Sequence, residues 1–124
     1  MEFLKELHKK NVIVRTDGFR LLEAIEVGRY KLSVQASTGH YCTPRVTFDL
    51  KHYSSMELAI YNKSGSMVSI NRSSTLRKFI RYKELASCAG KLNKPSVVYG
   101  YVPIDLINDL YLYLKGVDGQ NTIK

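Results

Sequence analysis

The chain has 124 residues, which is enough for one folded domain and too few for two of typical size. Hydrophobic residues make up 44% of it, an ordinary share for a globular protein, so the composition argues against a mainly disordered chain. The formal net charge of +8 favours an anionic partner, because a strongly basic chain concentrates anions around itself.

Two cysteines, Cys42 and Cys88, are too few to build the disulfide framework of a small secreted protein. Residues 1–7 mix charged and apolar side chains, unlike a signal peptide. No apolar run approaches the roughly 18 residues that a membrane-spanning helix needs. We therefore expect a soluble protein of a reducing cytoplasm, with no membrane partner.

The first third of the chain predicts short elements. Residues 3–8 favour a short helix, and the β-branched residues 12–14 favour a strand. The pair Asp17-Gly18 is a turn signal, and the stretch 19–27 fits either a strand or a short helix. The clearest strand is 30–37, where apolar and polar residues alternate.

The middle of the chain predicts two more strand regions. Residues 46–50 alternate and suggest the next strand. Residues 56–61 and 67–70 flank a short polar stretch that contains glycine, which is typical of a hairpin.

A helix is predicted to follow, capped by Ser73 or Ser74, running to about Ala89 and closed by Gly90. Its apolar residues share one face that would pack on the sheet. That face consists of Leu76, Phe79, Ile80 and Ala86.

The last part of the chain predicts a strand over 97–102 and an amphipathic helix over 104–115 that Gly116 stops. We expect residues 1–116 to form a single α+β domain and residues 117–124 to form a polar tail. The predicted fold is a small antiparallel or mixed sheet with two main helices and a short N-terminal helix.

Basic residues cluster between positions 72 and 94, where seven of them face one acid, Glu84, for a net charge of +6. Such a cluster makes a local field that attracts anions, but it can equally be a solvated face that keeps the protein soluble. The basic residues are Arg72, Arg77, Lys78, Arg81, Lys83, Lys91 and Lys94.

The segment 35–45 concentrates side chains that can donate hydrogen bonds, stack or constrain a loop. Arg45 can fork onto a phosphate, and Ser37 and Thr43 can donate to phosphate or ribose oxygens. Tyr41 or His40 can stack on a base. The amide of Gln35 can read a base edge or a hydroxyl, and Arg72, Arg77 and Arg81 would supply the remaining charge.

Three other interpretations of this segment stay open. Cys42 and His40 could be a nucleophile and its base, although no orienting carboxylate lies close in sequence. His40, Cys42, His52 and Cys88 are too scattered to suggest a zinc site. The segment could also be a hydrogen-bonded structural loop in which Cys42 is buried as a small apolar residue.

The stretch Ser33-Val34-Gln35-Ala36-Ser37, followed by His40-Tyr41-Cys42-Thr43-Pro44-Arg45, resembles a pattern in small phage and prophage accessory proteins. Tyr101-Val102-Pro103, leading into a helix that ends at Gly116, is similar to the same group. Among them the chain resembles the Thoeris anti-defence sponge family. The resemblance implies an oligomer that sequesters cyclic ADP-ribose-type signals or cyclic oligonucleotides without cleaving them, and it assigns no ligand residues.

We therefore expect non-catalytic binding of a nucleotide or other phosphorylated small molecule by a homo-oligomer with no cofactor, in the host cytoplasm if a phage encodes it. The alternative is an anti-CRISPR-like inhibitor or an interaction module that uses segment 72–94 on nucleic acid or a host defence protein. A small enzyme that uses Cys42 is the third hypothesis. The choice depends on whether segments 35–45 and 72–94 meet in space.

Overall fold

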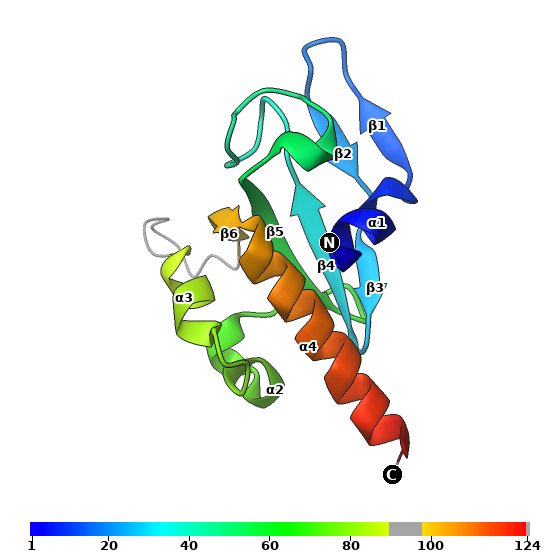
Figure 1. The fold of residues 1–124 in the computed structure, drawn as a ribbon, viewed down its shortest axis with the longest axis vertical. Helices are drawn as coiled ribbons and strands as arrows, with labels where there is room; N and C mark the ends of the chain where they lie inside the picture. The colour runs from blue at the N-terminus through cyan, green and yellow to red at the C-terminus, as the bar shows by residue number, and fades with distance from the viewer. Residues whose placement is uncertain (90–97, 124) are drawn as a thin grey trace.

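The computed structural model describes residues 1–89 and 98–123. Helices pack with two antiparallel sheets, so the predicted α+β class is confirmed (Figure 1). In chain order the elements are α1 (Glu2–His8), β1 (Val12–Val14), β2 (Arg20–Leu22), β3 (Ile25–Val27), β4 (Tyr30–Gln35), η1 (Leu50–His52), β5 (Ser55–Asn62), η2 (Ile70–Arg72), α2 (Ser74–Arg77), α3 (Tyr82–Ser87), β6 (Val98–Pro103) and α4 (Ile104–Ile123).

The larger sheet has the strand order β3-β4-β5-β6, with every neighbouring pair antiparallel. Alternation sends every second side chain of β4 and β5 into the core, where Leu32 stands opposite Ile60 and Val34 opposite Leu58. The helix α4 crosses the sheet (Figure 1) and adds a stripe of buried side chains to the same core. The stripe consists of Leu106, Ile107, Leu110, Tyr111 and Leu114.

The strands β1 and β2 form a separate hairpin that projects beyond the main sheet (Figure 1). Its turn follows the predicted Asp17-Gly18 signal: Gly18 has a φ of 90°, and the Asp17 carboxylate accepts a hydrogen bond from the Phe19 N–H. Unlike β4 and β5, β1 buries none of its side chains. The hairpin is therefore held to the body mainly through β2.

Residues 46–50 do not form the predicted strand. Side chains, and not a neighbouring strand, satisfy their backbone. The Tyr53 hydroxyl accepts from the Phe48 N–H and donates to the Val46 carbonyl. Arg20 donates to the Phe48 carbonyl. The alternating sequence lies in a loop because these contacts replace the ladder that a strand would need.

The predicted hairpin after residue 55 is present only in its first arm, β5. Asn62 closes the turn by accepting backbone N–H groups at its Oδ1. Met67 then forms one isolated bridge with Tyr61, and the chain enters η2 at Ile70. The second arm, predicted over 67–70, is therefore not a strand of the sheet.

The predicted helix from Ser74 to Ala89 is two short helices, α2 and α3. Ser73 is its N-cap as predicted, because the Ser73 Oγ accepts from the Leu76 N–H. The break between the helices turns Phe79 inward against Tyr113, with ring centroids 5.3 Å apart, and leaves Ile80 93% exposed. Ile80 was predicted to lie on the buried face of the helix. The break between α2 and α3 places it in solvent instead. Gly90 lies outside the described residues.

The helix α4 does not stop at Gly116 but continues to Ile123, so the predicted tail is helical over most of its length. The strand predicted over 97–102 is β6, from Val98 to Pro103, and residue 97 lies outside the described part. Within the described residues no helix combines the length and the apolar character needed to cross a membrane.

Candidate functional site

Gln35 ends β4 and is almost fully buried. Its Nε2 donates to the Leu22 carbonyl and its Oε1 accepts from the Leu22 N–H, both at 2.8 Å, while Nε2 also donates to Ser33. The side chain thus copies a peptide group and joins β4 to β2 as a neighbouring strand would. Gln35 was predicted to contact a ligand. In the structure its amide is hydrogen-bonded to Leu22 and Ser33 instead.

Ser37 and His40 are also buried, in the loop of residues 36–49 that connects β4 to η1. The Ser37 Oγ lies 2.7 Å from the His40 Nδ1, and the His40 ring stacks on Phe19 with centroids 4.8 Å apart. Burial lowers the pKa of His40, which favours the neutral imidazole. Both side chains were predicted to contact a ligand. In the structure they are turned inward, where they contact each other and stabilise the loop.

Cys42 lies in the same buried group and is 1% exposed. Its Sγ lies 3.3 to 3.5 Å from the carbonyl oxygens of Ser37, His40 and Pro44, and its single S–H can donate to any one of them. Burial raises the pKa of the Cys42 thiol, whereas a nucleophilic cysteine needs a lowered one. The geometry therefore matches the structural interpretation of this residue and gives no support to a Cys42–His40 catalytic pair.

Tyr41 and Arg45 are exposed in the loop, and the Tyr41 ring contacts both Arg45 and Tyr101 of β6. Tyr41 is 39% and Tyr101 49% exposed, and their ring centroids are 5.8 Å apart at an interplanar angle of 40°. The Arg45 guanidinium carbon lies 5.3 Å from the centre of the Tyr41 ring, within the range of a cation–π contact. We call these three side chains the tyrosine–arginine surface.

Tyr101 is held in an unusual backbone conformation. Between the pairs Met56–Val102 and Leu58–Tyr99, two residues of β6 face one residue of β5, so the strand bulges at this point. Tyr101 has a φ of 53°, in the left-handed region that bulky side chains rarely adopt. Such strain persists where the surrounding structure imposes it, and it is found often at functional sites.

The neighbours of the tyrosine–arginine surface fix its geometry. The Tyr41 N–H donates to the Glu57 carboxylate at 2.8 Å, and the Tyr101 N–H donates to the Tyr41 carbonyl at 2.9 Å. A Cβ on Gly100 would lie 3.1 Å from the Tyr41 Cβ, a tight contact, so the close approach of these two segments favours glycine.

Arg45 is anchored at one end only. Its Nε donates to the His40 carbonyl at 3.1 Å, which leaves the two terminal nitrogens without a partner among the described residues. Thr43, two residues earlier in the loop, is exposed and accepts from the Ser55 hydroxyl at 2.9 Å, so its own hydroxyl proton can still be donated. Arg45, Tyr41 and Thr43 are thus the predicted site residues that the structure brings together at the surface.

Arg72 and Arg77 lie elsewhere. The Tyr30 hydroxyl is 3.1 Å from the Ser73 Oγ, which places η2 and α2 beside the start of β4. The loop 36–49 follows the other end of that strand, and α2 lies far from it (Figure 1). Within one chain, Arg72 and Arg77 therefore cannot share a ligand with Arg45.

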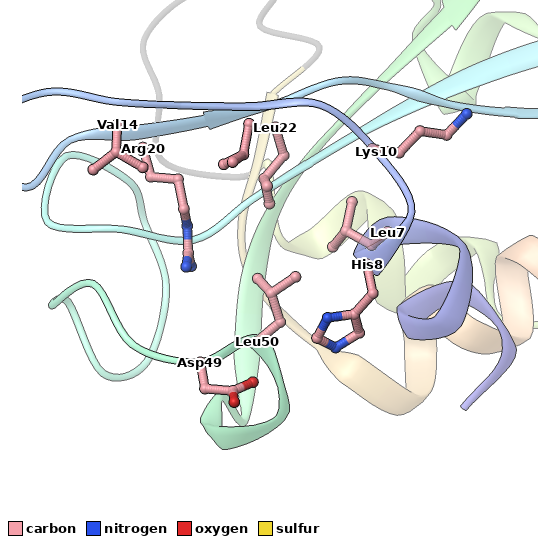
Figure 2. Close-up of a pocket in the computed structure, with 9 residues that line it drawn as sticks. Leu7, His8, Lys10, Val14, Arg20, Leu22, Asp49 and Leu50 are labelled. Atoms are coloured by element: carbon pink, nitrogen blue, oxygen red, sulfur yellow. The ribbon is translucent and has the colours of Figure 1, made fainter.

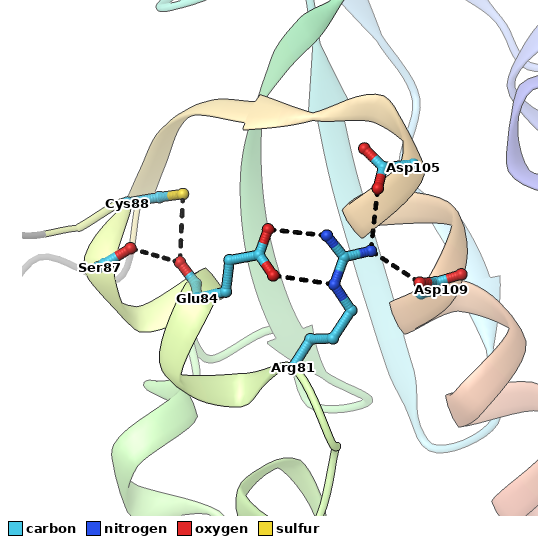
Figure 3. Close-up of polar contacts among 6 residues, drawn as sticks. All are labelled: Arg81, Glu84, Ser87, Cys88, Asp105 and Asp109. Carbon is cyan, nitrogen blue, oxygen red and sulfur yellow. Dashed lines mark hydrogen bonds and ion pairs between the residues drawn. The ribbon is translucent and has the colours of Figure 1, made fainter.

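Arg81 has a structural role in place of the predicted one (Figure 3). Its guanidinium makes two hydrogen bonds to Glu84, at 2.9 and 2.7 Å, and one each to Asp105 at 3.0 Å and Asp109 at 2.7 Å. These carboxylates raise the pKa of Arg81 above its already high value. The residue clamps α3 to the start of α4, and its charge is neutralised.

Replacing Arg81 with glutamine is expected to lower the free energy of unfolding by about 1 kcal/mol, because it leaves three carboxylates to repel one another. Urea denaturation followed by circular dichroism measures the change, which should shrink at high salt. Arg77→Gln removes the same charge from an exposed residue that has no ion pair within residues 1–89 and 98–123, and it is the matched control. Equal stabilities of the two variants would contradict the clamp.

The structure therefore defines a small α+β protein with an aromatic and cationic surface formed by the loop 36–49 and the bulged strand β6. Comparisons of the chain with protein-family models, with curated proteins and with solved structures found no match. Over residues 1–89 and 98–123, no three side chains of His, Cys, Asp or Glu are grouped so as to hold a metal ion.

Sequence reasoning missed Tyr101 and Glu57 as members of the site. The signal that could have revealed Tyr101 is Gly100, because a glycine within a strand pattern marks a bulge or a close backbone approach. Glu57 carries no such signal, since its role depends on the position of Tyr41.

Proposed function

We propose that the chain is a non-catalytic binding protein for a nucleotide or a similar phosphorylated molecule, which it holds at the tyrosine–arginine surface. The observation that carries the proposal is the strained φ of 53° at Tyr101, whose ring lies next to the Tyr41 ring that Arg45 also contacts. Strained backbone conformations are found often at functional sites, and this one holds an aromatic ring half exposed, which supports a role in binding a ligand.

The chemistry of the surface suits a nucleotide. Exposed tyrosine rings are platforms on which nucleobases stack, and stacking tolerates any base. The free terminal nitrogens of Arg45 match two oxygens of a phosphate, and the Thr43 hydroxyl can donate to a third oxygen. The net charge of +8 attracts anions to the whole molecule.

The role that best fits these features is sequestration of a nucleotide immune signal by a phage-encoded anti-defence protein in the host cytoplasm. The resemblance of residues 33–45 to a pattern in small phage and prophage accessory proteins, and of the chain to the Thoeris anti-defence sponges among them, supports this role. The contacts of Cys42 and His40 favour binding over turnover, because both side chains are turned inward. The signal would be a cyclic ADP-ribose-type molecule or a cyclic oligonucleotide.

Isothermal titration calorimetry with cyclic ADP-ribose, ADP-ribose and cyclic dinucleotides tests the proposal. We expect one of these nucleotides to bind, and Tyr41→Ala or Arg45→Gln to weaken it at least about tenfold, because a base stack or a charged phosphate contact contributes about 1–3 kcal/mol. Tyr101→Gly is expected to weaken binding similarly while relieving the strained φ, so its stability should stay near that of the wild type.

Arg77→Gln is the matched control, since it removes the same charge as Arg45→Gln at the far end of the molecule. Chromatography of the ligand recovered after denaturation separates sequestration, which returns it intact, from catalysis. A folded protein that binds none of these nucleotides, or that binds one equally well after Tyr41→Ala and Arg45→Gln, would overturn the proposal.

A second candidate function is an interaction module for nucleic acid or a host defence protein. It is favoured by the basic residues of the η2–α3 region, which are exposed and have no ion pair among the described residues: Arg72, Arg77, Lys78 and Lys83. Binding to generic single-stranded RNA that falls steeply with salt, and that Arg77→Gln with Lys78→Gln weakens, would support it. RNA binding that the two substitutions do not weaken would contradict this second candidate function.

A further inference from the structure

The outer edge of β1 is unpaired in the described part of the chain. Among the described strands β1 pairs with β2 alone, and Figure 1 shows its other side facing away from the molecule. The Arg15 N–H donates to the Phe19 carbonyl and the Glu23 N–H donates to the Asn11 carbonyl, so positions 11 and 15 use their backbone inside the hairpin. Because antiparallel pairs alternate, position 13 does the same, and Val12 and Val14 direct their N–H and C=O groups outward.

The side chains of this strand are apolar and unusually open. Val12 is 51%, Ile13 65% and Val14 58% exposed, in a strand made only of β-branched residues. An edge strand with free backbone groups and exposed apolar side chains is a template for pairing with another strand. The three residues together form an apolar surface whose exposure to water is unfavourable and which a partner strand would bury.

An open cavity of about 360 Å³ lies under the hairpin (Figure 2). The side chains of Val12 and Val14 line one wall, and Leu7, Leu22 and Leu50 add to its apolar lining. A strand added beside β1 would place alternate side chains on the same face as Val12 and Val14. The apolar wall of the cavity would then extend across the new strand.

We propose that β1 pairs antiparallel with β1 of a second copy of this chain, about a twofold axis through Ile13. In this register Val12 of each copy stands opposite Val14 of the other, so the outward N–H and C=O groups of both residues are matched on both chains. The two hairpins join into one sheet with the order β2-β1-β1-β2. The strand β1 can therefore pair with β1 of another copy without a change in the fold of either chain.

The charges beside β1 are compatible with a second copy. The twofold register pairs residues 11–15 of the two copies and places Arg15 opposite Asn11, so no two like charges meet within the paired strands. Within each chain Lys9 is paired with Glu6 and Arg15 with Asp17, which limits the repulsion that a net charge of +8 would otherwise cause at this edge. This balance favours a copy of the same chain over an acidic peptide from another protein.

Sedimentation velocity over a range of concentrations tests the pairing. The wild type is expected to reach twice the mass of the chain. Val14→Pro removes an outward N–H that β2 does not use, so the hairpin should persist by circular dichroism while the dimer dissociation constant rises at least tenfold. Val14→Thr keeps the N–H and the β-branch and is the matched control, with dimerisation retained.

Disulfide trapping tests the register. The two Ile13 residues would form a pair without hydrogen bonds, with Cα atoms about 4.5 Å apart, a separation that a disulfide can bridge. In a Cys88→Ser background, Ile13→Cys should give a covalent dimer on mild oxidation. Leu21→Cys, an exposed position opposite Ile13 within the chain, should stay monomeric.

A monomer at every concentration with no trapped dimer would overturn the inference. So would a dimer that Val14→Pro leaves intact, because its interface would lie elsewhere. The chain could instead be monomeric and bind an added acidic β-strand peptide, with the binding abolished by Val14→Pro. That result would assign the edge of β1 to another partner and would also overturn the inference. None of these variants touches the tyrosine–arginine surface, so each outcome leaves the proposed function to its own test.

Discussion

Replacing Gln35 with leucine is expected to lower the free energy of unfolding by about 3 kcal/mol. Leucine fills a similar volume, but it leaves the N–H and the carbonyl of Leu22 without the partners that they have at 2.8 Å in the native protein. Each unsatisfied buried backbone group costs roughly 1–3 kcal/mol. Urea denaturation followed by circular dichroism measures the loss.

Gln35→Glu separates the two hydrogen bonds. A glutamate keeps an acceptor for the Leu22 N–H, but in its ionised form it cannot donate to the Leu22 carbonyl, and it buries a charge. In its protonated form it regains the donor, so the difference in stability from the wild type should narrow as the pH falls. A Gln35→Leu variant within about 0.5 kcal/mol of the wild type would mean that water replaces the amide.

The sequence predicted the main sheet well, because alternation along β4 and β5 reflects a real division between a core face and an outer face. The errors have a common cause in contacts between distant residues. Residues 46–50 alternate as a strand does, yet Arg20 and Tyr53 satisfy their backbone and no neighbouring strand is needed. The helix break near Ile80 likewise depends on the packing of Phe79 against Tyr113 of α4.

The residues that the fold leaves at the surface of the candidate site were predictable only in part. Composition and loop chemistry drew attention to Tyr41 and Arg45, and the structure brings them together at the surface. Composition and loop chemistry cannot reveal that the Gln35 amide is hydrogen-bonded to the backbone of Leu22. Nor can they reveal that the Arg81 guanidinium donates to carboxylates 24 and 28 residues away. A side chain of the right type becomes a ligand contact only when the fold leaves it free.

The loop that carries Tyr41 and Arg45 owes much of its position to Arg20, which lies outside the basic segment. Its Nε and Nη2 both donate to the Ala36 carbonyl, at 3.2 and 2.6 Å, and its Nη1 donates to the Phe48 carbonyl at 2.7 Å. These contacts fasten the two ends of the loop to β2. A charged donor to a carbonyl contributes about 1.5–3 kcal/mol, so the guanidinium is a main support of the site.

Arg20→Ala is therefore expected to lower the free energy of unfolding by about 3 kcal/mol, and Arg20→Lys by less, because an ammonium cannot fork between the Ala36 and Phe48 carbonyls. Hydrogen exchange should quicken first in residues 36–49, since their backbone loses its anchor. Arg29→Ala removes the same charge from an exposed residue and should change stability by less than about 0.5 kcal/mol. If both alanine variants lose the same stability, net charge alone explains the effect and the loop has another anchor.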